Sequence, residues 1–408
     1  MPTIQRVVWH YYAYRVTTSI GLYLPVGVVF LTEVRNFGLD AVGTIMAAYL
    51  VAMLLAELPT GYLGDRVGRR ASLAVGSAVT ATAMAAWPLL ETPLQYLCIN
   101  VFWATGTTFR SGTASALLYE ILDETGSADQ FARISGRAAT LRLLASAIGA
   151  LAAGLLVTVD WSAPFLANAA LAALGIPLLV TLPRVDGETR HSGGQPSFRV
   201  RDALRTIRLQ TSRPDIRWFV AYTALFYGVY QLGMAFEQPA MRAAGVPVAG
   251  LGAVYAGFKF VSAGAASTAG WLQDRLGARG VYLGIAPVVG IAFASAAVWP
   301  VLVVPALFVS RGASAVSRPI RNQYLNDRLD DVGRATVLSG ASMVLSVCAA
   351  ILDVVGGVIA TGTGPVKLLA GAGIAAAGAG GLLWLLVDPV RTGETHLTGG
   401  ESPAVAPE

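Results

Sequence analysis

The sequence predicts an all-α integral membrane protein, with twelve transmembrane helices in two pseudo-symmetric six-helix bundles. Three observations carry this prediction: the composition, a series of long apolar runs, and a short charged loop that occurs twice. Of the 408 residues, 55% are hydrophobic and only 13% are charged, whereas soluble domains carry about 25% charged residues. Because a chain this apolar has too little polar surface for water, we expect its solvent to be the lipid bilayer.

Each apolar run is long enough to cross a bilayer, which takes about 20 residues of helix. Helices are predicted because a helix satisfies its own backbone in lipid and the runs are too long for barrel strands. The predicted spans are 8–32, 40–62, 71–91, 94–119, 136–159, 162–183, 217–241, 248–271, 280–298, 301–322, 335–360 and 366–387.

The spans divide into an N-terminal bundle, residues 1–183, and a C-terminal bundle, residues 217–388. Between them, 184–216 is rich in Arg, Gly, Ser and Thr and is expected to be a linker, with an amphipathic helix over Ser197–Leu209. The tail, 389–408, is expected to be disordered.

Arginines gather in the loops on one side of the predicted spans, including the linker and the loops that follow the second and eighth spans. The positive-inside rule places these loops in the cytoplasm. We therefore expect a multi-pass protein of the cytoplasmic membrane with both termini and the linker inside the cell.

A charged hairpin joins the second and third spans. It reads Gly-Tyr-Leu-Gly-Asp-Arg-Val-Gly-Arg-Arg over residues 61–70, and a second copy follows 209 positions later over residues 270–279. The second copy has Ala278 where the first has Arg69. A glycine at Gly68 permits a tight reversal, and Gly61 is expected where another helix comes close.

The pattern G-x-x-x-D-R-x-G-R-R in this position resembles the signature loop of the major facilitator superfamily of secondary transporters. The resemblance implies two six-helix bundles with a substrate site between them near the membrane midplane. It also implies that Asp65 faces the N-terminal end of span eleven and Asp274 faces span five near Gly136, which would latch the outward-open state. The expected latch residues are Gly61, Asp65, Arg66, Gly68, Arg69, Arg70, Gly270, Asp274, Arg275 and Gly277.

Ionisable side chains within the predicted spans are functional candidates, because burying a charge in the bilayer costs at least ~2.5–3.5 kcal/mol. In the resembling family, spans 1, 2, 4, 5, 7, 8, 10 and 11 line the cavity, and these candidates fall on such spans. Those expected to line the substrate cavity, with two tyrosines of span seven, are Arg15, Arg110, Glu120, Tyr227, Tyr230, Lys259 and Arg311.

Two carboxylic acids, Glu57 and Asp353, are the candidates for carrying a coupling proton. Arginine does not release its proton and serves better as an anion clamp or a conformational partner. The alternative is structural: Arg15 could neutralise Glu57, and Lys259 could neutralise Asp353, across facing helices.

Two motifs of the family's drug/proton antiporters are missing. Span five has small residues such as Gly149 and Gly154 but no Gly-Pro pair. In span four, Thr108 stands where the pattern has an arginine four residues before Gly112. These gaps argue against efflux and against proton antiport, but not against transport itself.

Other chemistry is not indicated. The sequence has no Walker loop and no H-E-x-x-H, G-x-S-x-G or C-x-x-C motif, so we expect no enzyme activity and no cofactor. Three histidines and two cysteines, scattered along the chain, do not suggest a metal site. Although the formal net charge is +5, no soluble basic domain exists to bind nucleic acid.

The predicted function is secondary transport by alternating access, with proton-coupled efflux of a drug or secondary metabolite as the leading hypothesis. The alternative is a proton-coupled importer or facilitator of a small, anionic solute, since basic groups outnumber acids at depth. A non-transporting membrane sensor or scaffold is the third hypothesis. The expected partners are a small-molecule substrate, protons and the lipid bilayer, and the expected state is a monomer.

Overall fold

The computed structural model describes residues 4–183, 214–328 and 334–390. These residues form helices joined by short turns, and no strand occurs among them. The predicted all-α fold class is confirmed. The linker residues 184–213, the amphipathic helix expected over Ser197–Leu209 and the tail from residue 391 lie outside the described residues.

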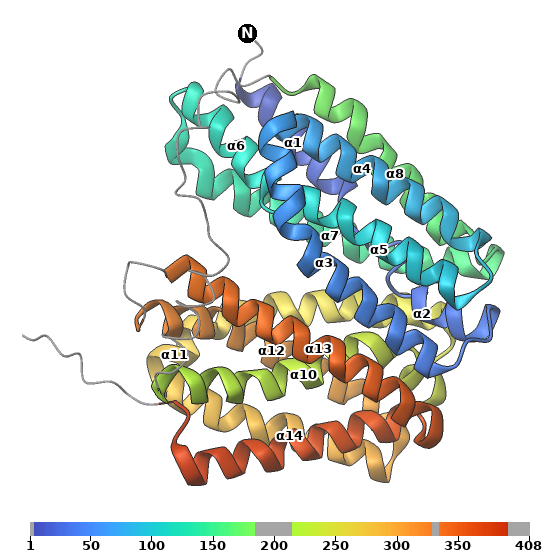
Figure 1. Cartoon of the computed structure of the whole chain (residues 1–408), viewed down its shortest axis with the longest axis vertical. Helices are drawn as coiled ribbons and strands as arrows, with labels where there is room; N and C mark the ends of the chain where they lie inside the picture. The colour runs from blue at the N-terminus through green and yellow to red at the C-terminus, as the bar shows by residue number, and fades with distance from the viewer. Residues whose placement is uncertain (1–3, 184–213, 329–333, 391–408) are drawn as a thin grey trace, which may run out of the picture.

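The helices of the first half, residues 4–183, are numbered in chain order (Figure 1). They are α1 (Ile4–Thr17), α2 (Gly27–Val29), the π-helical turn η1 (Phe30–Val34), α3 (Leu39–Val67), α4 (Arg69–Ala86), η2 (Trp87–Leu89), α5 (Pro93–Arg110), α6 (Thr113–Glu124), η3 (Ala128–Gln130), α7 (Phe131–Val159) and α8 (Ala163–Thr181). Those of the second half are α10 (Pro214–Ala243), α11 (Val248–Val298), η5 (Pro300–Leu302), α12 (Val303–Asn326), α13 (Arg334–Thr363) and α14 (Pro365–Val387).

Nine helical segments of the described chain are long and apolar enough to cross a membrane. One of them, α11, contains two predicted spans, because its 51 residues bend at Gly277, where φ is 65°. The two predicted spans that are not continuous helices are the first and the fourth.

The first span is interrupted between α1 and α2, although we expected one helix over 8–32. Pro25 lacks a backbone N–H and disfavours a helical conformation at Leu24. Gly21 lies so close to α7 that a Cβ there would collide with the carbonyl of Ser146. The chain therefore passes α7 in a non-helical segment before the helix resumes at Gly27.

The fourth span is interrupted between α5 and α6. Gly112 has φ of +72°, a conformation that side chains rarely adopt. Arg110 is the last residue of α5, so the break places this arginine at a helix end within the predicted span.

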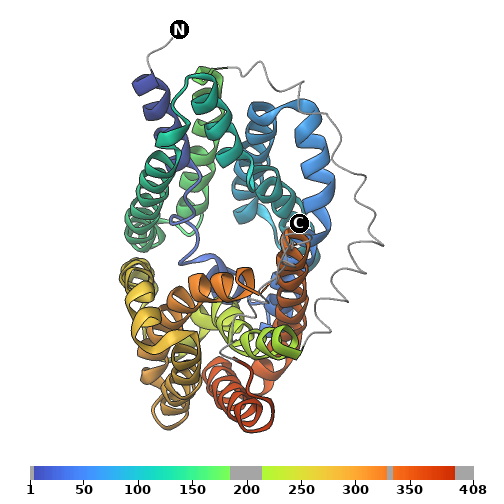
Figure 2. The ribbon, with the colours of Figure 1, turned by 90° about the vertical axis from the view of Figure 1, so that its left-hand side faces the viewer.

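The two halves are joined at one end of the molecule and diverge toward the other (Figure 1). We call the joined end, near Glu33, Arg242 and Gly364, the sealed end, and the end with Gly68 and Gly277 the motif end. Figure 2, which faces the motif end, shows the helices of the two halves as two separate groups. The largest cluster of buried apolar side chains includes residues of both halves, among them Phe30 and Phe236.

The most extensive packing between the halves is in two helix pairs, α3 with α13 and α7 with α11, and α10 also packs on α2 and α3. A Cβ on Gly43 would collide with the carbonyl of Asp353, and one on Gly252 would collide with the carbonyl of Ala150. Gly43 and Gly252 are 209 positions apart (252 − 43), the offset between the two charged loops. Glycine thus permits the same close backbone approach at equivalent positions of both pairs. We call these two contacts the seams.

The charged loops are tight turns, as expected. Gly68 has φ of +89° between α3 and α4, and Gly277 has φ of +65° within α11. In this conformation Gly61 lies inside α3, and a Cβ there meets nothing within 4 Å. The close neighbour is instead one turn later, where a Cβ on Gly64 would lie 3.0 Å from the Ser72 hydroxyl.

Candidate functional site

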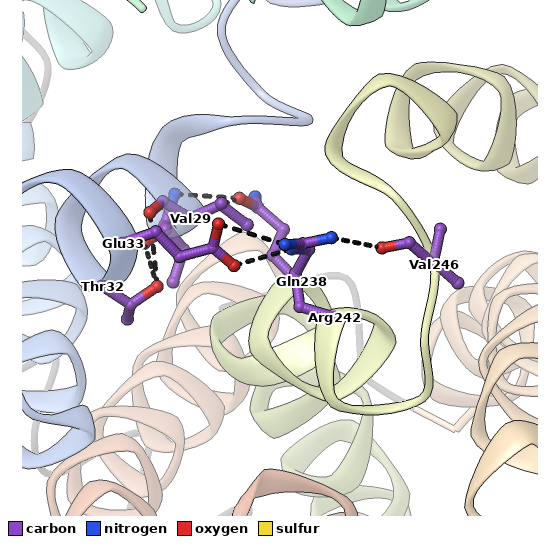
Figure 3. A network of polar contacts seen from close by, with 7 residues as sticks. Val29, Thr32, Glu33, Gln238, Arg242 and Val246 are labelled. Carbon is purple, nitrogen blue, oxygen red and sulfur yellow. Dashed lines mark hydrogen bonds and ion pairs between the residues drawn. The ribbon is translucent and has the colours of Figure 1, made fainter.

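A glutamine from α10 caps the helix that restarts after the break in the first span (Figure 3). The Oε1 atom of Gln238 accepts hydrogen bonds from the backbone nitrogens of Val28, at 2.9 Å, and Val29, at 3.0 Å. Its Nε2 atom donates to the carbonyl of Leu24 at 2.7 Å and to the Tyr255 hydroxyl at 3.1 Å. All four hydrogen-bonding positions of this buried amide are therefore used.

An ion pair closes the sealed end beside this glutamine (Figure 3). Arg242 donates from Nε to Glu33 Oε1 at 2.6 Å and from Nη2 to Glu33 Oε2 at 3.3 Å. Its Nη1 donates to the carbonyl of Val246 at 2.8 Å. We call Gln238, Arg242 and Glu33 the clasp. The hydrogen bonds between described residues of the two halves, including one from Asp40 to Thr361, lie at this end.

A second ion pair lies deeper, within the C-terminal half. Arg311 of α12 donates from Nη2 to both carboxylate oxygens of Glu237, at 2.6 and 2.7 Å. The side chains are 11% and 1% exposed. Arg311 also donates to the Tyr230 hydroxyl at 3.0 Å and lies over the ring of Phe258. This cavity candidate is therefore fully engaged by its own half.

The two tyrosines expected to line a cavity, Tyr227 and Tyr230, line a pocket of about 50 Å³ between α10, α11 and α12. Its wall also includes Arg318 and Arg321, together with the serines of α12. This pocket belongs to the C-terminal half.

Four cations at the centre of the molecule have no counter-ion among the described side chains. They are Arg15 (α1), Arg110 (α5), Arg142 (α7) and Lys259 (α11), and each is half-buried. None makes an ion pair or hydrogen bond to another described side chain, and the Nε atoms of Arg15 and Arg142 are buried without a partner. Arg142 interacts electrostatically with Arg15 and Arg110, and Lys259 interacts with Arg142. We call these residues the cation cluster.

The two candidate proton carriers differ in environment. Asp353 is 3% exposed, and its Oδ1 has no hydrogen-bond partner. Glu57 is exposed. Neither of the ion pairs considered from sequence, Arg15 with Glu57 or Lys259 with Asp353, forms between these described side chains. Asp353 is therefore the one of the two carboxyls that the protein encloses, whereas Glu57 lies at the surface.

The residues of the charged loops lie apart from the cation cluster. Asp274 is exposed at the motif end, and a Cβ on Gly136, its expected neighbour, meets nothing within 4 Å. No hydrogen bond or ion pair joins Asp274 to a described residue of α7 in this conformation. The side chain of Asp65, and those at the start of α13 that it was expected to face, lie outside the described part of the structure.

The arginines of the loops have local partners. Arg69 pairs with Glu120 at 3.3 Å, and Arg70 donates to the carbonyls of Leu179 and Val180. Glu120, expected to line the cavity, is therefore engaged at the motif loop. Arg66 and Arg275 lie at equivalent positions, 209 apart, and each stacks on an aromatic ring four residues earlier.

Sequence reasoning missed the clasp and the Arg311–Glu237 pair. Glu33 and Arg242 are 209 positions apart (242 − 33), and so are Val29 and Gln238 (238 − 29). Equivalent positions of two related halves meet only near the axis that relates them. The Glu33–Arg242 contact could therefore have been predicted from the sequence, because the two residues have opposite charges at equivalent positions. Arg142 was also not among the residues expected to line the cavity.

Comparisons with known proteins agree with this architecture. The family model described as Major Facilitator Superfamily matches residues 16–238, more than half of the chain. A curated relative, the uncharacterized MFS-type transporter YxaM of Bacillus subtilis (strain 168), is 20% identical over 241 residues. That match covers 58% of this chain and 59% of the relative, so it spans about three fifths of the relative's length.

Solved structures share the fold over nearly their whole length. The nucleoside transporter NupG is 13% identical, with a TM-score of 0.77, and the likeness covers 97% of this chain and 100% of that one. A bacterial homolog of the human lysosomal transporter Spinster, in an inward-facing and occupied conformation, has a TM-score of 0.70 at 12% identity, covering 95% of each chain. The xylose transporter XylE from E. coli, in an inward-open conformation, has a TM-score of 0.66 at 13% identity, covering 96% of this chain and 98% of that one.

Proposed function

The chain belongs to the major facilitator superfamily, a family of multi-pass membrane transporters, and on this premise we propose that it moves a small organic solute by alternating access. The observation that carries the proposal is the distribution of contacts between the halves. The hydrogen bonds between their described residues lie at the sealed end, while the candidate side chains lie deeper, toward the region where the halves diverge. When the contacts that close one end are weak, that end can open while the other end closes.

The polar contacts at the sealed end suit a reversible closure. The Glu33–Arg242 pair is about one third exposed on each side, so it contributes at most about 1 kcal/mol. Gln238 adds hydrogen bonds of about 0.5–1.5 kcal/mol each. Sums of this size can be reversed by a ligand that binds one state more tightly than the other.

Proton coupling is assigned to Asp353. Its carbonyl forms the seam with Gly43, and its carboxyl is buried without a hydrogen-bond partner for Oδ1. Because the residue lies on the contact that must separate during the cycle, gaining or losing its charge would change the energy of the sealed state. Glu57 is the second candidate but is exposed.

Efflux of a drug or secondary metabolite remains the proposed direction and substrate class. A second candidate function, uptake or facilitated movement of a small anionic solute, is favoured by one observation, the central cations that have no counter-ion among the described side chains. The names of the structural neighbours, which include a nucleoside transporter and a D-xylose-proton symporter, support proton coupling and a small solute but not efflux.

A reconstitution experiment tests the proposed function. A thermal-shift screen of the purified chain against nucleosides, sugars, organic acids and cationic drugs selects a probe. Counterflow of the labelled probe in proteoliposomes then tests transport, and a proton gradient of either sign tests coupling and direction. We expect Asp353→Asn to abolish gradient-driven accumulation but to spare counterflow, and Glu57→Gln to leave both unchanged. If no probe in the screen shows counterflow, the sensor or scaffold hypothesis replaces transport.

The orientation in the membrane is tested separately. We assume that the protein lies in the plasma membrane with both termini in the cytoplasm. A cysteine at Ser192, in the linker, should then be labelled only from the cytoplasmic side. A reagent that does not cross the membrane should leave Ser192→Cys unlabelled in intact cells, and labelling there would invert the topology. The proposed monomer predicts a single-chain mass by light scattering in detergent.

A further inference from the structure

We propose that the cation cluster, Arg15, Arg110, Arg142 and Lys259, is the binding site for a small organic anion that carries carboxylate or phosphate groups. This proposal rests on the proposed transport function, because it names the chemical class of the solute that would occupy the space between the halves. It assigns the leading role to side chains of the N-terminal half, with Lys259 contributed from the C-terminal half.

Three of the four residues lie at similar depth. Arg15, Arg142 and Lys259 are each eleven residues after the first residue of their helices, Ile4, Phe131 and Val248. At about 1.5 Å per residue, eleven residues correspond to roughly 17 Å. Since the apolar core of a bilayer is about 30 Å thick, this places the charges near its middle, Lys259 from the sealed end and the arginines from the motif end.

The seam between α7 and α11 aligns the two halves of the site. Gly252 touches the carbonyl of Ala150 where these helices cross. From that crossing toward the motif end, Arg142 is eight residues away (150 − 142) and Lys259 is seven (259 − 252). The two side chains therefore lie at matching depth on neighbouring helices of opposite halves, which agrees with their electrostatic interaction.

Arg110 extends the cluster into the N-terminal half. Its stem passes over Gly76 of α4, where a Cβ would lie 2.6 Å from Arg110 Cγ. Its charge interacts with Arg15 and with the tyrosines Tyr14, Tyr23 and Tyr49, none of which is a carboxylate. The helix α5 ends at Arg110, because the backbone leaves the helical conformation at Ser111 and Gly112.

The charges of the cluster are not neutralised by the described carboxylates. Glu237 interacts electrostatically with Lys259, but it is already bonded to Arg311 at 2.6 Å through two oxygens. No other carboxylate among the described side chains forms an ion pair with a member of the cluster. Like charges at the centre of a membrane protein repel one another and cost free energy, unless an anion or water compensates them.

The composition of the cluster selects the ligand. Three of its members are arginines, whose planar forks bind carboxylate and phosphate oxygens in pairs. The positive charge of the cluster also repels cationic drugs. An anion held between Arg142 and Lys259 would also draw the halves together beyond the seam, which gives a solute a direct way to favour closure around itself.

Binding to the purified full-length chain in detergent tests the site without requiring transport. The probes are succinate, glycerol 3-phosphate and inorganic phosphate, with uridine and glucose as neutral compounds and tetraphenylphosphonium as a cation. We expect saturable binding of at least one organic anion by calorimetry, weakening as salt is raised. Succinate and glycerol 3-phosphate distinguish a carboxylate site from a phosphate site, and inorganic phosphate shows whether the organic part is needed.

Substitutions connect the binding to the cluster. Arg15→Gln, Arg142→Gln and Lys259→Gln should each weaken anion binding roughly tenfold or more, the effect of losing a charged hydrogen bond. Arg137→Gln is the matched control, because Arg137 is exposed five residues earlier on α7. Arg142→Lys keeps the charge and should lose less than Arg142→Gln. Thermal unfolding of each variant establishes that it is folded.

The proposal is overturned if no organic anion binds, or if Arg142→Gln binds it as tightly as Arg137→Gln does. Preference for uridine, glucose or tetraphenylphosphonium would also overturn it while leaving transport intact. Anion binding that depends on the cluster, without counterflow of that anion in liposomes, would instead refute the transport function and keep the site.

Discussion

Gln238 and Val29 occupy equivalent positions of the two halves, 209 residues apart, and meet through a 3.0 Å hydrogen bond at the sealed end. Glu33 and Arg242 lie one helical turn further along the two halves, have the same offset and form an ion pair. Contacts between equivalent residues mark the axis relating the two halves. The clasp therefore lies where a rocking motion of one half against the other must break or re-form its bonds.

The clasp should hold the sealed end closed. Gln238→Leu leaves the backbone nitrogens of Val28 and Val29 unsatisfied, which costs about 1–3 kcal/mol for each group that water does not reach. The reporter is Val42→Cys, a buried position next to the seam at Gly43, in a chain whose Cys98 and Cys348 are replaced by serine. We expect Gln238→Leu to raise its labelling rate by a polar thiol reagent roughly fivefold or more.

Glu33→Gln is the comparison for that variant, because it weakens only a part-exposed ion pair, worth about 1 kcal/mol or less. Its labelling rate should lie between those of the parent chain and Gln238→Leu. Equal rates in all three chains would show that the seams alone keep the sealed end closed.

The Arg311–Glu237 pair should be structural. Glu237→Gln leaves Arg311 buried without a counter-charge and is expected to destabilise the protein by about 3–5 kcal/mol, measured by thermal unfolding in detergent. Replacing both residues, with Arg311→Met and Glu237→Leu, removes the unpaired charge and should recover much of that loss. A double variant as unstable as Glu237→Gln would show that the pair has a net stabilising role beyond neutralisation.

The seam should tolerate no side chain at its closest point. Gly252→Ala places a methyl group against the carbonyl of Ala150 and should lower stability by about 1–3 kcal/mol. Gly264→Ala on the same helix is the control, because a Cβ there meets nothing within 4 Å. Alanine is the better helix former by about 1 kcal/mol, so this control should be neutral or slightly stabilised. Similar melting temperatures for the two variants would mean that α7 and α11 separate without cost.

The motif aspartates should affect the rate of the cycle rather than the stability of this conformation. Asp274 is exposed and makes no ion pair to another described residue, so Asp274→Asn should change the free energy of unfolding by less than about 0.5 kcal/mol. If Asp274 and Asp65 latch the opposite state, Asp274→Asn and Asp65→Asn should nevertheless slow counterflow. Parental counterflow rates in both variants would remove the latch from the mechanism.

Much of the architecture was readable from the sequence because lipid imposes one simple rule. Each crossing segment must be apolar for about 20 residues and must satisfy its own backbone, so long apolar runs identify helices. The repeated loop at residues 61–70 and 270–279 then revealed the two halves. Hydropathy did not reveal the breaks at Gly21 and Gly112, because an interrupted span is as apolar as a continuous one.

Charge placement was only partly readable. The sequence identified Arg15, Arg110, Lys259 and Arg311 as intramembrane cations, but composition does not tell which cation has a partner. In the tertiary structure, Glu237 pairs with Arg311 and Glu120 pairs with Arg69, while Asp353 Oδ1 has no hydrogen-bond partner. Pairing requires atoms within hydrogen-bond distance, and helix rotation and tilt set that distance without leaving a trace in hydropathy.

Composition, the apolar runs and the repeated loop were thus enough to predict a helical membrane protein of two related halves and the types of charge within its spans. The tertiary structure alone decided where the halves touch, at Gly43, Gly252 and the clasp, and which charges of the described residues remain uncompensated. The physical reason is that burial in lipid acts on each helix separately, whereas closure and neutralisation act between helices far apart in the chain.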